Sequence, residues 1–205
     1  MELPQEYFGA PSSRYSSFLL PIYQPIKRKV FISHYHGHQW ETDKFLRDFG
    51  DVFIHRSVGT LGGQSFINSN NTDYVMQCIR RDYVGDATVT IVLVGSCTHG
   101  RRYVDWEIKG SLQRGEEDLP NGLLGIEMPS SGQYFNPPPR LELNWQRDVA
   151  DCYARCYRYP NNKEELRQWI EDAFRARTSR DKWIKNPHET MFGYDRTCSV
   201  CKIIH

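Results

Sequence analysis

Tyr103 and Glu107 are the residues whose types and spacing point most directly to chemistry. They are four positions apart, so they share one face of the helix that the sequence Tyr103–Ile108 predicts. This helix closely follows the run from Ala87 to Gly95, whose β-branched apolar residues predict a buried strand. Ligands of open α/β sheets bind beyond the carboxyl ends of such strands. An acid beside an aromatic ring in a nucleotide crevice suits the cleavage of a glycosidic bond.

The carboxylate of Glu107 is the candidate catalytic group. Cleavage of an N-glycosidic bond passes through an oxocarbenium-like state, and a fixed carboxylate stabilises the positive charge on the ribose. Where the leaving base is already cationic, as nicotinamide is, no general acid is needed to expel it. One carboxylate then suffices, whereas ordinary glycosidases use two. The alternative is that Glu107 is a solvated acid near the start of a helix, stabilised by the helix dipole.

The turn Ser33-His-Tyr-His-Gly-His38 is the second candidate site, because it follows the first predicted strand and should line the same crevice. Ser33, His34 and Tyr35 are expected to contact ribose or phosphate. The three alternating histidines also allow a metal site, but Gly37 favours a turn in which their rings do not share a face. Ordinary loop histidines are the remaining interpretation.

Two further positions are expected to contact the substrate. Ser96 ends the central strand, and Arg56 is placed to bind a diphosphate, with a simple surface arginine as the alternative. The glycines of Gly59–Gly63 would allow phosphates to approach the backbone closely, or the segment is a plain connection.

The cysteines include a possible split zinc site. Cys198 and Cys201 have a recognised ligand spacing and precede His205, whereas Cys152 and Cys156 are separated by three residues instead of two. The alternative is two pairs of reduced thiols. We expect no metal in the catalytic site.

Strands and helices alternate along the chain, which predicts a doubly wound, mostly parallel α/β sheet with helices on both faces. Strands are expected at 29–33, 52–55, 87–94, 122–126 and 153–159, and helices at 39–49, 73–83, from 103 and at 162–175. Residues 57–72 form a long polar loop, and 127–140 a connection. We divide the chain into an N-terminal arm, 1–27, an α/β domain, 28–146, and a C-terminal strand-helix extension packed on that domain, 147–205.

Composition excludes several partners. The 205 residues carry 26 basic and 25 acidic side chains, so neither nucleic acid nor an anionic membrane is the expected partner. No stretch approaches the roughly 18 apolar residues of a membrane span, and the start of the chain does not have the pattern of a secretory signal. We therefore expect a cytoplasmic protein with reduced cysteines.

Three stretches together resemble a TIR domain: Val30–His34, Ala87–Gly95 and Tyr103–Ile108. More narrowly, they resemble the TIR-like family of the Thoeris antiphage system, in its signal-producing subunit, over about residues 28–126. The resemblance implies a flavodoxin/TIR-like sheet and an enzyme that takes NAD as substrate and needs no cofactor. Nicotinamide would be released, and the ADP-ribose part would become a cyclic or conjugated signal that activates a partner effector.

The resemblance also assigns residues and partners. The family's catalytic glutamate corresponds to Glu107. Many catalytic TIR domains carry Trp four residues earlier, where this chain has Tyr103, with Trp106 adjacent to the acid. A phage-derived trigger and self-assembly, in which the family's loop after the second strand takes part, are further implied partners.

Two alternatives stay open. One is a non-catalytic TIR-type interaction module that signals by assembly, because fold does not fix function. The other is nucleoside or nucleotide N-glycoside hydrolysis on a flavodoxin-like fold, which needs a second carboxylate or a water-activating group. Asp105 is close to Glu107 in sequence but lies about 200° around the helix from it, which weakens it as the second acid.

Overall fold

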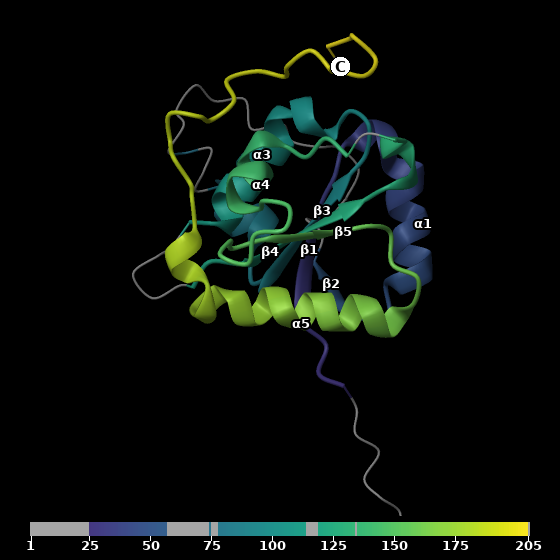
Figure 1. The fold of residues 1–205 in the computed structure, drawn as a ribbon, viewed down its shortest axis with the longest axis vertical. Helices are drawn as coiled ribbons and strands as arrows, with labels where there is room; N and C mark the ends of the chain where they lie inside the picture. The colour runs from purple at the N-terminus through teal and green to yellow at the C-terminus, as the bar shows by residue number, and fades with distance from the viewer. Residues whose placement is uncertain (1–24, 57–73, 75–77, 114–118, 134, 205) are drawn as a thin grey trace, which may run out of the picture.

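The computed structural model describes residues 25–56, 74, 78–113, 119–133 and 135–204. Within these residues the protein forms a five-stranded sheet in which each strand is parallel to its neighbours (Figure 1). The strand order is β2-β1-β3-β4-β5. The strands are β1 Lys29–Ser33, β2 Ile54–Arg56, β3 Val89–Val94, β4 Gly122–Glu127 and β5 Arg155–Tyr157. The predicted doubly wound α/β fold is confirmed.

Helices cover both faces of the sheet, as Figure 1 shows. The helices are α1 Gln39–Phe49, α3 Arg102–Ser111, α4 Pro139–Asn144 and α5 Lys163–Ser179. Shorter helical turns are η1 His36–His38, η2 Ile79–Val84, η3 Thr98–Gly100, η4 Pro129–Ser131 and η5 Asp181–Trp183. In the described part of the chain, none of the helices is long and apolar enough to cross a bilayer.

The central strand β3 shows how the two layers of the core arise. Its side chains alternate between the faces, as a pleated strand requires. Ile91 and Leu93 pack with residues of α1 and α5, whereas Val92 and Val94 pack with residues of α3 and α4. All six residues of β3 are buried, because both faces are covered. This accounts for the continuous apolar run in the sequence.

Helix α5 begins where its capping residues predict. The side chain of Asn162 accepts a hydrogen bond of 2.9 Å from the backbone N–H of Glu165. Glu165 in turn accepts one of 2.8 Å from the backbone N–H of Asn161. The first bond satisfies a donor that the first helical turn leaves free, and the second ties the residue before the cap to the helix. The helix runs on to Ser179 instead of ending at 175, because Ala176 is also buried in the core.

Strand β2 starts two residues later than predicted. Val52 and Phe53 were assigned to the strand for their apolar side chains, but they pack into the core from the turn after α1. The N–H of Val52 bonds to the carbonyl of Phe49, which keeps it in that turn. The buried residues at this point, Val52 and Phe53, are therefore not the residues that pair with β1.

The predicted strand 153–159 and connection 127–140 also need correction. Tyr153 and Ala154 bond to Asn121 and Asn144 instead of β4, so β5 is confined to Arg155–Tyr157. The expected connection contains η4 and leads into α4, whose first residue is Pro139. Of the predicted helix 73–83, the described part includes a helical Tyr74 and the π-helical turn η2. The loop 57–72 lies outside the described residues, as does most of the N-terminal arm.

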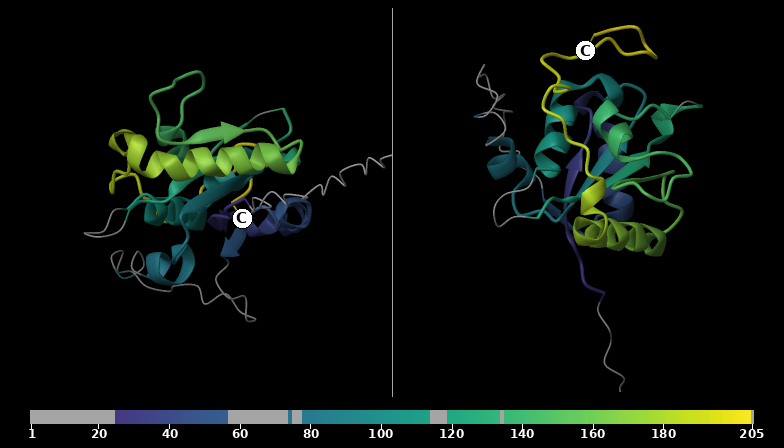
Figure 2. Two further views of the ribbon diagram at one scale, coloured as in Figure 1. Left: turned by 90° about the horizontal axis from the view of Figure 1, so that it is seen from below. Right: turned by 60° about the vertical axis from the view of Figure 1, so that its left-hand side comes forward.

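Residues 185–204 form a C-terminal segment that runs along the outside of α3 to the carboxyl ends of the strands (Figure 2). The indole N–H of Trp106 donates to the carbonyl of Phe192 over 2.8 Å. Farther along, the N–H of Arg196 donates to the carbonyl of Gly100, also over 2.8 Å. The segment is thus bound to α3 and to the loop that connects β3 with α3.

Candidate active site

Ser33 and Glu107 meet where β1 ends beside α3. The hydroxyl of Ser33 donates a hydrogen bond of 2.6 Å to Oε2 of Glu107. Ser33 is the last residue of β1 and is fully buried, while Glu107 lies in the second turn of α3 and is half-buried. In a sheet of this order the crevice between β1 and β3 is where ligands bind. The structure therefore brings together two of the predicted site residues at the expected edge.

The carboxyl group of Glu107 is held in an unusual electrostatic state. Burial raises its pKa to about 8, and the hydrogen bond from Ser33 opposes that rise. Without a ligand, the neutral form therefore predominates at pH 7. A cation placed beside the group would favour the carboxylate and release a proton. Shifted acids of this kind are concentrated at functional sites.

Tyr103 lies one turn before Glu107 on α3, as the spacing predicts. Its ring packs edge-on against Trp106, with 5.5 Å between the ring centroids. The guanidinium of Arg102 lies 5.0 Å from the centroid of Tyr103 and 4.8 Å from that of Trp106. Trp106 itself is a core residue that packs with Ile79 and Val84. Tyr103, which is half-buried, is therefore the aromatic of this pair that is more accessible to a ligand.

The turn after β1 lines a small cavity of about 10 Å³. His34, Tyr35 and His38 contribute to its wall, together with Glu41 and Gly95. This volume holds at most about one water molecule. Residues His36–His38 form η1, so the turn that Gly37 predicts is present. Among the described residues, these histidines do not gather with other ligand side chains into a metal-binding group.

His34 and Tyr35 have partners from different parts of the chain. Nε2 of His34 lies 2.9 Å from Oε1 of Gln39, at the start of α1. The guanidinium of Arg101 lies 5.0 Å from the ring centroid of Tyr35. Burial raises the pKa of Tyr35, and the charge of Arg101 opposes that shift. The phenol therefore stays protonated at neutral pH and can donate a hydrogen bond.

Ser96 follows the end of β3, and Arg56 is the last residue of β2. Ser96 lies against Cys97, with 3.7 Å between its hydroxyl oxygen and Sγ. Arg56 lies level with Phe31 in the sheet, but its Nη2 donates to Oδ2 of Asp86 over 2.9 Å. Asp86 precedes β3, so this guanidinium is turned toward the amino ends of the strands. The structure does not bring Arg56 together with Glu107.

Asp105 is engaged in a buried ion pair. Nε of Arg140 donates to its Oδ1 over 2.8 Å, and the backbone N–H of Phe192 donates to its Oδ2 over 2.9 Å. Asp105 and Arg140 are each 1% exposed. The carboxylate is fixed on the side of α3 that faces α4 and the C-terminal segment. It is not positioned as a second catalytic acid beside Glu107.

A larger groove of about 880 Å³ lies on that side of α3. Its lining includes Asp105, Trp145, Lys185 and Phe192, from α3, the region after α4 and the C-terminal segment. Glu107 belongs neither to this groove nor to the small cavity. The segment that follows β2, which includes Gly59–Gly63, lies outside the described residues.

Three residues of this region were not singled out from the sequence. Glu41 is 2% exposed and accepts hydrogen bonds from the backbone N–H and hydroxyl of Ser130. Asp195 accepts a hydrogen bond of 2.6 Å from the backbone N–H of Arg102, the first residue of α3. Cys97 contacts Cys198 and Cys201. All these partners are at least 89 positions apart in sequence, so local patterns contain no signal for them.

Comparison with protein families adds an independent finding. Residues 31–133, half of the chain, match the family model described as Thoeris protein ThsB, TIR-like domain. The matched stretch includes both Ser33 and Glu107 but ends before β5, α5 and the C-terminal segment. No curated protein matches the chain.

Proposed function

The chain belongs to the Thoeris ThsB TIR-like family, and from this premise we propose that it cleaves NAD at the bond between nicotinamide and ribose. Membership supports a role in Thoeris antiphage defence. In the proposed role, the ADP-ribose part becomes a cyclic or conjugated nucleotide that activates a separate effector protein. In this proposal infection supplies the trigger, as a phage-derived molecule.

One observation carries the proposal: a half-buried carboxyl, fixed by Ser33, at the strand edge where such folds bind nucleotides. The hydrogen bond of 2.6 Å from Ser33 to Oε2 restrains the carboxyl of Glu107. A preorganised acid needs little reorganisation when charge develops on a ligand. A solvated helix acid would have neither the buried partner nor the raised pKa.

The chemistry follows from charge. The nicotinamide ring of NAD is cationic, and its approach lowers the pKa of Glu107 so that the carboxyl ionises. The bond from the ribose carbon to the ring nitrogen then breaks, and its electron pair leaves with nicotinamide, which becomes neutral. The carboxylate faces the cation that remains on the ribose. A hydroxyl or adenine nitrogen of the same molecule, or a second small molecule, captures that cation. These steps involve no redox change.

The remaining predicted contacts have supporting roles in this proposal. Tyr103 would stack on a ring or ribose face, and Ser33 would position the acid. His34, Tyr35 and Ser96 follow the ends of β1 and β3, where the phosphates would lie. Arg56 would reach a diphosphate only after releasing Asp86.

The test is to incubate the purified protein with NAD, with and without extract from phage-infected cells. Nicotinamide and new nucleotides are followed by mass spectrometry. We expect Glu107→Gln to lose at least about a thousandfold in turnover while keeping its fold, because the developing charge loses its counter-charge. Circular dichroism checks the fold.

Glu164→Gln is the matched control, because Glu164 is an exposed helical acid on α5. It should turn over NAD at the wild-type rate. Nicotinamide release by Glu107→Gln at the wild-type rate would refute the assignment of Glu107. If cells that carry Glu107→Gln are still protected from phage although no nicotinamide is released, the alternative of a module that signals by assembly would be favoured.

A further inference from the structure

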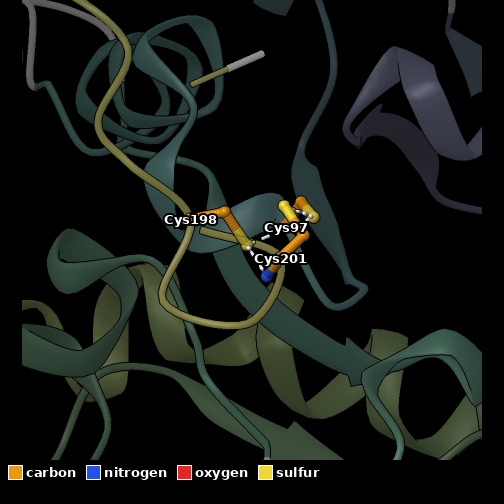
Figure 3. A group of neighbouring side chains, drawn as sticks. All are labelled: Cys97, Cys198 and Cys201. Atoms are coloured by element: carbon orange, nitrogen blue, oxygen red, sulfur yellow. Dashed lines mark hydrogen bonds between the residues drawn. The ribbon is translucent and has the colours of Figure 1, made fainter. Parts of the chain in front are cut away.

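We propose that Cys97, Cys198 and Cys201 bind a zinc ion that links the C-terminal segment to the loop between β3 and α3. Figure 3 shows the three side chains converging from these two parts of the chain. The inference does not depend on NAD cleavage. It also revises the split site expected from the sequence, because Cys97 takes the place of Cys152 and Cys156.

The spacing of the sulfur atoms fits a tetrahedral metal site. Sγ of Cys97 lies 3.2 Å from that of Cys198 and 3.6 Å from that of Cys201, and all three sulfurs lie within 4.8 Å of one another. Zinc–sulfur bonds of about 2.3 Å at tetrahedral angles place sulfur atoms about 3.8 Å apart. A disulfide would need about 2.05 Å, and all three cysteines are free thiols.

The backbone around Cys198 and Cys201 is shaped to present both sulfurs on one side. The N–H of Cys201 points at Sγ of Cys198 over 3.4 Å. The turn is closed by bonds from Lys202 N–H to Cys198 carbonyl, 2.9 Å, and from Cys198 N–H to Ile203 carbonyl, 3.0 Å. Lys202 has a φ of 63°, a conformation that lysine rarely adopts. The strained residue directly after Cys201 indicates that this turn is held by its surroundings.

Burial and charge also favour a bound cation. Cys97 is 5% exposed and Cys198 is fully buried, so the cluster is not a chance gathering of surface thiols. Three thiolates and one Zn²⁺ leave a net charge of −1, and the buried guanidinium of Arg101 contacts the backbone of Cys97. Its Nε donates to the carbonyl of Cys97 over 3.0 Å. Thiolates are soft ligands that select zinc over calcium or magnesium.

The binding step is balanced in charge and protons. Three thiols release three protons as Zn²⁺ binds, so affinity rises with pH. The fourth tetrahedral position remains for water or another ligand. The catalytic proposal contains no step at this site.

The first experiment measures metal content after purification in the presence of zinc and removal of free metal. The wild type should retain about one zinc per chain, and each of Cys97→Ser, Cys198→Ser and Cys201→Ser should fall to about one tenth of that or less. Cys152→Ser and Cys156→Ser are the matched controls, since their thiols belong to the same protein but lie outside the cluster. Both should retain the full content. Equal loss in these controls would refute the assignment.

The second experiment uses the wild type alone, so misfolded variants do not affect it. Zinc should protect Cys97, Cys198 and Cys201 from alkylation, and a chelator should expose them, as read by peptide mass spectrometry. Cobalt in place of zinc should give thiolate charge-transfer absorption and the strong visible bands of a tetrahedral ion. Alkylation that does not respond to metal, or a disulfide between Cys97 and Cys198 or Cys201, would overturn the proposal.

Discussion

At the scale of single residues, the pKa of Glu107 is subject to two opposing effects, its burial and its contact with Ser33. Burial favours the neutral carboxyl, whereas the serine hydroxyl favours the carboxylate. Both residues could be selected from the sequence. Ser33 ends one apolar strand, and Glu107 lies on the helix that follows another. Their contact could not be predicted in this way, since the partners are 74 positions apart.

The pH dependence of turnover should report this pKa. In the proposed mechanism the carboxylate is the active form, so kcat/KM should rise with pH and level off above about 8. The measurement is the initial rate of nicotinamide release at low NAD across pH. A profile that levels off near pH 5 would show that the acting group has an ordinary carboxyl pKa.

Replacing Ser33 by Ala should move that profile to higher pH. The hydroxyl lowers the pKa of Glu107, so its loss raises the pKa further. We expect kcat/KM at pH 7 to fall about tenfold, with most of the rate recovered at high pH. Ser131→Ala is the control, because Ser131 also donates to a glutamate, Glu127, but outside this site. A pH-independent loss would mean that Ser33 has another role.

Glu107 should also reduce stability as pH rises. Its pKa is higher in the folded protein, about 8, than the ordinary 4.5, so the folded state binds more protons between these values. The free energy of unfolding therefore falls with rising pH in that window. Glu107→Gln removes the effect and should gain stability over the wild type toward pH 8 but not below pH 4.5. Urea denaturation at both ends of the window measures it; parallel curves would contradict the assignment.

At the scale of elements, the strands and longer helices could be predicted because hydrophobic periodicity and helix caps depend on residues that are close in sequence. β1, α1 and the start of α5 follow such signals. The first residues of β2 and β5 could not be predicted in this way, since Val52 and Tyr153 are buried without pairing in the sheet. The N-terminus of α3 was also hidden, because Asp195 caps it from a distant segment.

Removing that cap should weaken α3. Asp195→Ala leaves the N–H of Arg102 without its acceptor and should lower the free energy of unfolding by about 1 kcal/mol. Asp195→Asn keeps a side-chain acceptor and should recover most of the loss. Chemical denaturation of the three proteins gives the comparison. Equal losses in both variants would point to the charge of Asp195 instead of its hydrogen bond.

At the scale of the whole molecule, Arg140 joins three parts of the chain. From α4 it pairs with Asp105 of α3, and its Nη1 donates to Asn186 and to the carbonyl of Pro187 over 2.9 Å each. The C-terminal segment, which lies beyond the family match, is thereby part of the same folded unit as the proposed site.

Arg140→Ala should therefore be far more costly than loss of a surface arginine. It leaves the carboxylate of Asp105 buried without its counter-charge, which costs about 3–5 kcal/mol. Arg167→Ala removes an exposed pair with Glu164 and should change stability by less than about 1 kcal/mol. Thermal denaturation of both variants measures the difference. Similar melting temperatures would show that the buried pair is not what binds α4 to α3.

The cap on α3 has a consequence for the timing of synthesis. Asp195 follows Arg102 by 93 positions, so a ribosome working at about 5–20 residues per second adds it roughly 5–20 s later. During that interval the helix that carries Glu107 has an uncapped end. A nascent chain therefore lacks this acceptor, and with it about 1 kcal/mol of stabilisation of α3, until translation has passed the C-terminal segment.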